Sequence, residues 1–216
     1  MTINNILNLS DQVILVALGS TKIEETLKAI DHCSSIVIFN RILYLTDASI
    51  NHTNIQHIKS RNVPSIKNYQ TFVVNEVPDL VLSNIPDTFN GHFLFINWDG
   101  FVVNPSGWTN SFLDYDYIGA PWPWFNHAVG NGGFCLKSKK FLLNQQDICK
   151  TYKVIGNEDM ELSMRLREKF KLQGCQYATP NIGYQFSTEV GDYKKHNSFG
   201  FHSFKYHPEF KHIIYG

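Results

Sequence analysis

Phe93-Leu-Phe-Ile-Asn-Trp-Asp-Gly-Phe-Val-Val103 has strand-forming residues on both sides of a polar break, and the rest of the predicted fold is arranged around it. We predict that it is a long central strand. Side chains alternate between the two faces of a strand, so Asn97 and Asp99 are expected to point one way and Trp98 the other. Gly100 then permits a sharp turn. Two such oxygens at the end of a buried strand suit a divalent cation and its phosphates, although a plain turn capped by Asp99 accounts for the residues equally well.

The residues before this stretch predict alternating strands and helices. Val13-Ile-Leu-Val-Ala-Leu18 is a continuous apolar run, typical of a strand that is covered on both faces. A helix is predicted over residues 22–32, and strands are predicted over residues 35–39 and 42–45. This order of strand, helix and strand indicates the α/β class, with a Rossmann-type, mixed but mostly parallel sheet flanked by helices.

Between these elements and the central strand, the spacing of apolar residues is less regular. Residues 46–62 are polar and are expected to form a loop, and residues 63–66 are expected to form a short strand. Residues 69–82 have apolar side chains at helical spacing, with Pro78 expected to kink or divide the helix.

Beyond the central strand, two features stand out. Residues 115–124 end in two prolines and two tryptophans, so Trp122 and Trp124 are expected to project from a loop. Asn157-Glu158-Asp159 begins the clearest helix of the chain, which Gly174 ends. Short strands are predicted at residues 134–136, 176–178 and 184–186.

Composition excludes several classes of function. The 216 residues carry 19 basic and 19 acidic side chains, and this zero net charge argues against nucleic-acid binding, which needs a basic surface. The length suits a single domain. The four cysteines are far apart, which predicts reduced, buried thiols. Without a recognisable signal peptide or membrane-spanning run, we expect a cytoplasmic protein, with a composition compatible with peripheral attachment at the inner face of the membrane.

Three later segments contain residues that could carry chemistry. Gly132 and Gly133 lack side chains and would let a bulky substrate approach the backbone, although a plain turn is the simpler interpretation. Glu158 and Asp159 begin a helix whose dipole is expected to lower their pKa values, and they are either helix caps or a catalytic base. His202 is either a packed core histidine or a metal ligand.

These segments have a recognisable order, and the chain resembles inverting glycosyltransferases of the GT-A fold, of the galactosyltransferase or Fringe type. Those enzymes have an Asp-x-Asp motif at a strand end, a Gly-Gly segment and an acidic pair that opens a helix, and many have a late histidine. The counterparts here are Asn97-Trp98-Asp99, Gly132-Gly133-Phe134, Glu158-Asp159 and His202.

From about residue 11 to 204, the chain is most similar to a bacterial family of uncharacterised, glycosyltransferase-like domains. The motifs that carry this resemblance are Trp98-Asp99-Gly100-Phe101, Tyr115-Asp116-Tyr117-Ile118-Gly119-Ala120-Pro121-Trp122, Val129-Gly130-Asn131-Gly132-Gly133-Phe134 and Phe199-Gly200-Phe201-His202. They are fairly specific as a set and weak one by one.

The resemblance implies one glycosyltransferase-like domain over residues 1–216, with a nucleotide-donor half at about 11–100 and an acceptor and catalytic half at about 101–204. It implies a hexosyltransferase-type transfer of sugar, with inversion, from a nucleotide-sugar to a glycan or lipid-linked acceptor in surface polysaccharide synthesis. The donor-binding residues would be Ala17, Gly19, Asn97, Asp99 and Gly100. The acceptor-binding residues would be Trp122, Trp124, Asn131, Gly132 and Gly133.

The resemblance also implies roles in the chemistry. Asp159 would be the base that deprotonates the acceptor hydroxyl, with Glu158 as the alternative base or as an acceptor contact. Asp99 and His202 would hold Mn²⁺ or Mg²⁺ on the donor diphosphate, where the ion acts as a Lewis acid. The chain departs from the family pattern at Asn97, which replaces the first carboxylate of the motif and weakens metal binding.

Two alternatives from other classes remain. The first is a non-catalytic carbohydrate-binding or assembly module that keeps the fold, which Asn97 and the short chain favour. The second is a metal-dependent hydrolase that uses some of the nine histidines, but the chain lacks the H-E-x-x-H and H-x-H-x-D spacings.

Overall fold

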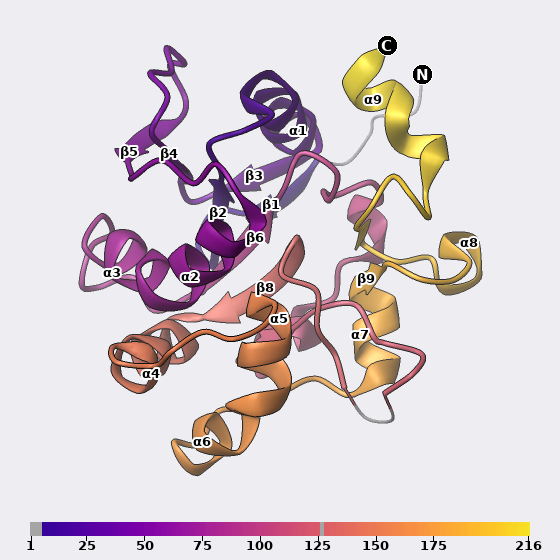
Figure 1. The fold of residues 1–216 in the computed structure, drawn as a ribbon. Coiled ribbons are helices and arrows are strands. Elements are labelled where there is room, and N and C mark those ends of the chain that lie inside the picture. The colour runs from indigo at the N-terminus through magenta and orange to yellow at the C-terminus, as the bar shows by residue number, and fades with distance from the viewer. Residues whose placement is uncertain (1–5, 126–127) are drawn as a thin grey trace.

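Residues 6–125 and 128–216 are described by a computed structural model. Six strands form a central sheet in the order β5-β4-β2-β6-β8-β7 (Figure 1). They are β2 (Val13–Leu18), β4 (Ile42–Thr46), β5 (Gln56–Lys59), β6 (His92–Ile96), β7 (Tyr117–Ile118) and β8 (Phe134–Ser138). The strands β5, β4, β2 and β6 are parallel, whereas β8 runs antiparallel to β6 and β7. The predicted mixed, mostly parallel α/β sheet is therefore confirmed.

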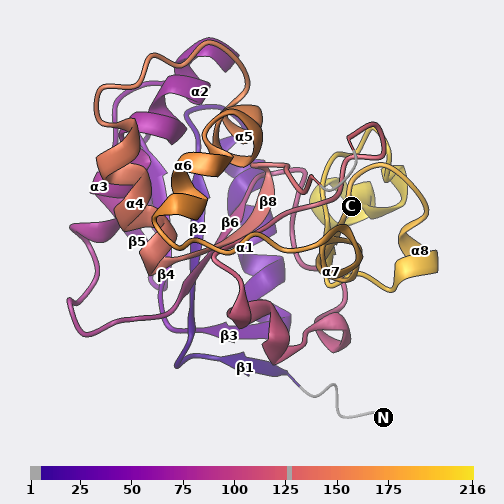
Figure 2. The same cartoon turned by 90° about the horizontal axis from the view of Figure 1, so that it is seen from below.

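Helices cover both faces of this sheet (Figure 2). They are α1 (Ile23–Ile36), α2 (Ile66–Asn75), α3 (Val77–Leu82), α4 (Lys139–Cys149), α5 (Glu158–Met160), α6 (Arg167–Leu172), α7 (Pro180–Phe186), α8 (Tyr193–His196) and α9 (Lys211–Tyr215). Helices α2, α3 and α4 pack against one another on one face, and α1 lies on the opposite face with α9 against it. Two small parallel pairs lie outside the main sheet: β1 (Leu7–Leu9) with β3 (Val37–Phe39), and β9 (Ser187–Thr188) with β10 (Gly200–Phe201).

The predicted strands β2 and β4 are confirmed, as are the helix and the strand between them, although the boundary between α1 and β3 is displaced. Helix α1 continues to Ile36, where the prediction had already begun a strand, and the Ser34 and Ser35 hydroxyls donate hydrogen bonds to carbonyls of its preceding turn. The polar segment predicted as a loop contains β5, an edge strand in which Ile58 alone is buried. An edge strand needs few apolar residues, so its sequence has little hydrophobic pattern.

The long central strand predicted over residues 93–103 is wrong in length. Strand β6 ends at Ile96, and Asn97 and Gly100 then exchange backbone hydrogen bonds at 3.2 Å in each direction. This tight turn breaks the alternation of side chains on which the expected alignment of Asn97 with Asp99 depended.

Helix boundaries follow local chemistry. The strand predicted over residues 63–66 is wrong, because residues 63–65 lead into α2, which begins at Ile66, and Ser65 Oγ caps it by accepting a hydrogen bond from the Asn68 N–H at 3.3 Å. Pro78 divides the following helices as predicted, since α2 ends at Asn75 and α3 begins at Val77. The strand predicted over residues 184–186 is wrong, because these residues end α7.

The described part of the chain has two further global properties. No helix within residues 6–125 and 128–216 is long and apolar enough to cross a membrane. All four cysteines are free and buried, as predicted. Burial raises the pKa of the Cys135 thiol to about 11, so it is protonated at neutral pH.

Candidate active site

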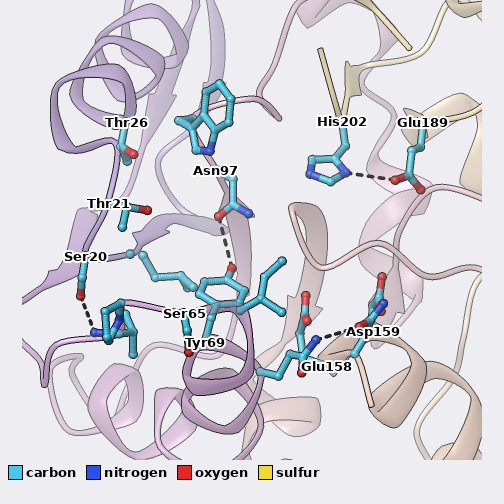
Figure 3. A pocket seen from close by; sticks show the side chains of 18 residues that line it. Ser20, Thr21, Thr26, Ser65, Tyr69, Asn97, Glu158, Asp159, Glu189 and His202 are labelled. Atoms are coloured by element: carbon cyan, nitrogen blue, oxygen red, sulfur yellow. Dashed lines mark hydrogen bonds and ion pairs between the residues drawn. The ribbon is translucent and has the colours of Figure 1, made fainter. Parts of the chain in front are cut away.

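A cavity of about 450 Å³ lies at the edge of the sheet where the parallel strands β2 and β6 end. In open α/β sheets this edge is the usual place for ligands. The polar and functional side chains around it come from distant parts of the chain: Ser20, Thr21, Ser65, Tyr69, Asn97, Glu158, Asp159, Glu189 and His202. Figure 3 shows them facing one common space, with the acidic pair on one side of it and His202 with Glu189 on another.

The antiparallel strand β8 explains why the Gly-Gly segment joins this edge. Because β8 runs against β6, it begins where β6 ends, and Ile96 pairs with Phe134. Gly133 therefore lies beside the turn after β6, and a β-carbon on Gly100 would come within 2.8 Å of the Gly133 carbonyl oxygen.

His202 connects two carboxylates across the site. Its Nδ1 atom lies 3.3 Å from Glu189 Oε1, and its Nε2 atom lies 3.7 Å from Asp99 Oδ1. Burial acts to lower the pKa of His202, but the neighbouring Glu189 and Asp99 carboxylates outweigh burial, and the pKa is raised. Burial also raises the pKa of Asp99. The histidine is therefore oriented by Glu189, with its other nitrogen directed at Asp99.

Two glycines make room for the His202 ring. A β-carbon on Gly133 would overlap the imidazole, and a β-carbon on Gly100 would lie 2.8 Å from its Cδ2 atom. The ring is confined between these two backbone positions. Gly133 thus leaves room for the His202 ring. The space at Gly133 that was predicted to be open for an acceptor is filled by this ring.

We expect Gly133→Ala to destabilise the fold by about 1–3 kcal/mol, because the new methyl group overlaps a confined ring. The free energy of unfolding in denaturant measures this change. A matched control is Gly133→Ala combined with His202→Ala, where the overlapping ring is absent. The alanine at position 133 should then cost little, and an equal cost in both backgrounds would contradict the packing described here.

Glu158 and Asp159 form a half-buried acidic pair at the cavity wall. Burial raises the pKa of Glu158 to about 7, and the neighbouring Asp159 charge adds to the rise. Burial also raises the pKa of Asp159, against hydrogen bonds from backbone N–H groups, including that of Met160 at 2.7 Å. The prediction that the helix dipole lowers both pKa values is therefore wrong, because burial outweighs a short helix end.

Hydrogen bonds to the Glu161 carboxylate fix the turn that precedes the acidic pair. This fully buried carboxylate accepts hydrogen bonds from the backbone N–H groups of Ile155 (3.1 Å) and Gly156 (2.6 Å) and from the Tyr152 hydroxyl (2.7 Å). It also pairs with Arg165 at 2.6 Å within a π-helical turn, Glu161–Arg165. Such turns occur often at functional sites, and this one follows directly after α5, which carries the acidic pair.

The structure corrects most of the predicted acceptor contacts. Trp122 is 6% exposed, and its indole packs on Gly130, so it does not project from the loop. Asn131 is 1% exposed and folds the turn by accepting a hydrogen bond from the Gly133 N–H at 3.0 Å. The space at Gly132 is filled by the Glu158 carboxylate. Trp124 is 60% exposed but does not line the cavity.

The predicted donor contacts divide into two groups. Gly19 and Asn97 line the cavity, and Asn97 Oδ1 accepts a hydrogen bond from the Tyr69 hydroxyl at 3.3 Å. Ala17 is fully buried within β2 and does not reach the cavity, whereas its neighbour Leu18 does. Gly100 backs the His202 ring instead of lining the cavity.

The donor set at Asp99 and His202 fits a divalent cation that is completed by other ligands. Ligands at about 2.1 Å from Mg²⁺ in neighbouring octahedral positions are about 3 Å apart, close to the 3.7 Å between Asp99 Oδ1 and His202 Nε2. Glu189 on Nδ1 is the partner that metal-ligating histidines usually have. Within residues 6–125 and 128–216, no three His, Cys, Asp or Glu side chains are grouped so that they could hold a metal ion by themselves.

Several residues of the site were not predicted from sequence, among them Glu189 and Tyr69. Glu189 is a single carboxylate 13 positions before its histidine, and only the pairing of β9 with β10 brings the two together. Tyr69 begins a predicted helix and has no pattern that marks it as a cavity residue. No local sequence signal identifies either of them.

One solved structure supports the architecture, and one family model matches the sequence. The family described as "Protein of unknown function (DUF5672)" matches residues 52–202. A solved glycosyltransferase involved in the glycosylation of the major capsid of PBCV-1 is similar with a TM-score of 0.60 at 15% identity, over 95% of this chain and 100% of that chain. The apo-form glycosyltransferase GlyE of Streptococcus pneumoniae TIGR4 has a TM-score of 0.49 at 16% identity, over 88% of this chain and 54% of that chain. No curated protein matches the sequence. The chain thus has the fold of the first of these structures.

Proposed function

The chain belongs to the family described as "Protein of unknown function (DUF5672)", and we propose that it is a glycosyltransferase that moves a sugar from a nucleotide-sugar donor to an acceptor hydroxyl with inversion. One observation carries this proposal. A half-buried acidic pair, Glu158 and Asp159, faces the same cavity as His202, at the edge where parallel strands end. That arrangement supplies a proton acceptor and an anion-binding side to one substrate space.

The cavity has the size and lining of a nucleotide-sugar site. Its volume of about 450 Å³ is within the range of small-molecule pockets, roughly 300–1,000 Å³. Hydroxyl groups of Ser20, Thr21 and Ser65 surround one end, and the acidic pair and His202 surround the other. The nucleotide would bind at the hydroxyl end and the donor sugar near the carboxylates.

Asp159 is the proposed base. Aspartate ionises more readily than glutamate, and backbone N–H groups donate to the Asp159 carboxylate. Two neighbouring carboxylates do not ionise together easily, so Glu158, with its pKa near 7, retains a proton longer. Asp159 would then accept the acceptor hydroxyl proton while Glu158 binds the acceptor as a hydrogen-bond donor.

Asp99 and His202 would hold Mn²⁺ or Mg²⁺ together with the donor diphosphate. When bound, the ion stabilises negative charge on the leaving diphosphate. Glu189 holds the imidazole so that Nε2 faces Asp99. The protein would contribute one carboxylate and one imidazole to the ion. Asn97, at the first position of the motif, would not be a ligand, because its Oδ1 atom accepts a hydrogen bond from the Tyr69 hydroxyl.

We expect Asp99→Ala to weaken Mn²⁺ binding in the presence of UDP strongly, and Glu189→Gln to weaken it about 10-fold or more, since partners of ligating histidines have such effects. Calorimetric titration of Mn²⁺ with UDP present measures both affinities. Glu168→Gln is the control, because that side chain is 77% exposed and bonds only to Lys171. Equal affinity in Asp99→Ala and the wild type would rule out this metal site.

A non-catalytic carbohydrate-binding module is the second candidate, and the single motif carboxylate left by Asn97 favours it. A thermal-shift screen with UDP-sugars and other nucleotide-sugars, followed by a turnover assay with and without Mn²⁺, separates the two. A stabilising donor that is hydrolysed or transferred supports the glycosyltransferase. Glycan binding without any nucleotide-sugar shift or turnover supports the module. An acceptor from surface polysaccharide synthesis, glycan or lipid-linked, remains part of this proposal.

A further inference from the structure

A second cavity, of about 540 Å³, shares Trp98 with the candidate active site. We call it the Trp98 cavity. Its walls come from the turn after β6, from the segment after β10, and from α9. Asp99, a proposed ligand of the donor's metal, lies in its lining, so a molecule in the Trp98 cavity would be next to the donor.

Aromatic side chains form one side of the Trp98 cavity. The half-buried Trp98 ring meets Phe204 at a centroid distance of 5.7 Å, and Phe204 meets Tyr215 at 6.3 Å. Tyr215 is 52% exposed, unusual for a large aromatic side chain. Flat apolar surfaces with polar edges suit the apolar face of a pyranose ring.

Cationic side chains form the rim of the same cavity. Lys205 and Lys211 both line it and are exposed, and neither forms an ion pair within the described part of the chain. A third ammonium, of Lys22, lies 5.4 Å from the Trp98 ring centroid but is held by Glu25 at 2.8 Å. Asp99 is the carboxylate in the lining. The balance of charge favours a negatively charged ligand.

The backbone of this cavity is strained at a residue that faces it. Ser203 has a φ of 78°, in the left-handed region that favours glycine, and its N–H donates to the Asp99 carbonyl at 2.7 Å. Its hydroxyl has no hydrogen-bond partner within residues 6–125 and 128–216. Strained residues cluster at ligand sites, and this one presents a free hydroxyl beside the two lysines.

We propose that the Trp98 cavity is an acceptor subsite for an acidic sugar, whose ring stacks on Trp98 and whose carboxylate or phosphate binds Lys205 and Lys211. The reacting hydroxyl of the acceptor would extend from this subsite to Asp159 in the candidate active site, which shares Trp98 with it. The proposal rests on the proposed glycosyltransferase function and names its acceptor class. It replaces the predicted acceptor platform, because Trp122 is buried and Trp124 lies outside both cavities.

The test is a binding experiment with simple probes. The protein has four tryptophans, so a sample with labelled indole nitrogens gives four signals, and Trp98→Phe identifies the Trp98 signal by its loss. Methyl β-D-glucuronide, glucose 1-phosphate and the neutral methyl β-D-glucoside are each titrated while these signals are recorded. We expect the two acidic probes to shift the Trp98 signal, and the glucoside to bind at least about fivefold more weakly.

Lysine variants assign the charge. Lys205→Gln and Lys211→Gln should each weaken the glucuronide about fivefold, as expected for an exposed charge pair near 1 kcal/mol, while the distant, exposed Lys150→Gln should not. Saturating UDP distinguishes the acceptor from the donor's own phosphates. Unchanged glucuronide binding supports the acceptor subsite, and displacement by UDP overturns it, as does equal binding of glucuronide and glucoside. Because no turnover is measured, failure here is distinct from failure of the transferase proposal.

Discussion

Asp159→Asn is expected to reduce sugar transfer by about 10²–10⁴-fold, the usual contribution of a general base. The substitution keeps the size of the side chain and removes its ability to accept a proton. The carboxylate lies in the cavity wall, its charge supported by the Met160 N–H at 2.7 Å. The rate constant of transfer, measured with a donor identified by thermal shift, is the quantity to compare.

Two measurements make this expectation specific to catalysis. The thermal shift produced by the donor should persist in Asp159→Asn, because the base does not hold the nucleotide. Glu158→Gln should lose less activity, because its amide can still donate a hydrogen bond to the acceptor. Full transfer activity in Asp159→Asn would show that Asp159 is not the base, and a greater loss in Glu158→Gln would exchange the two roles.

Glu158→Gln is expected to stabilise the protein above pH 7 and to have little effect near pH 4. The pKa of Glu158 is raised from 4.5 to about 7 in the folded protein. The folded state therefore binds a proton that the unfolded chain releases between pH 4.5 and 7, and stability falls as pH rises through this window. Glutamine cannot ionise, so it avoids the loss. At 1.36 kcal/mol per pKa unit, the rise from 4.5 to about 7 makes the gain on the order of 3 kcal/mol.

Denaturant unfolding of wild type and variant at pH 4 and pH 8 checks this difference. The control is Glu168→Gln, which alters a mostly exposed carboxylate and should change stability by less than about 0.5 kcal/mol at either pH. If Glu158→Gln is no more stable than the wild type at pH 8, burial does not raise the pKa of Glu158. Greater stability with lower activity would indicate that the acidic pair is retained for function.

The sequence located the residues of the candidate site better than it described their surroundings. Gly133, Glu158, Asp159 and His202 were all singled out from local pattern, and the structure brings them to one edge of the sheet. Their mutual packing was beyond local pattern. That Gly133 makes room for His202 depends on two strands, β8 and β10, that are far apart in the chain.

The aromatic residues likewise show that local sequence does not predict packing. Trp122 and Trp124 have the same local context of neighbouring prolines, yet one is 6% exposed and the other 60%. Trp98, expected to point away from the site, lines both cavities. Exposure of an aromatic side chain is decided by what packs against it, and Gly130 offers that surface to Trp122 alone.

Local sequence patterns were enough to predict the α/β class, the buried strand Val13–Leu18, the division of helices at Pro78 and the acidic pair at a helix start. These follow from short-range rules of hydrophobic period, proline geometry and turn chemistry. Long-range packing sets three other features: β6 ends before Asn97, Glu189 orients His202, and the acidic pair holds protons more tightly than isolated carboxylates. Pairing between distant segments and removal of water from a carboxylate are properties of the assembled fold, which no local stretch of sequence contains.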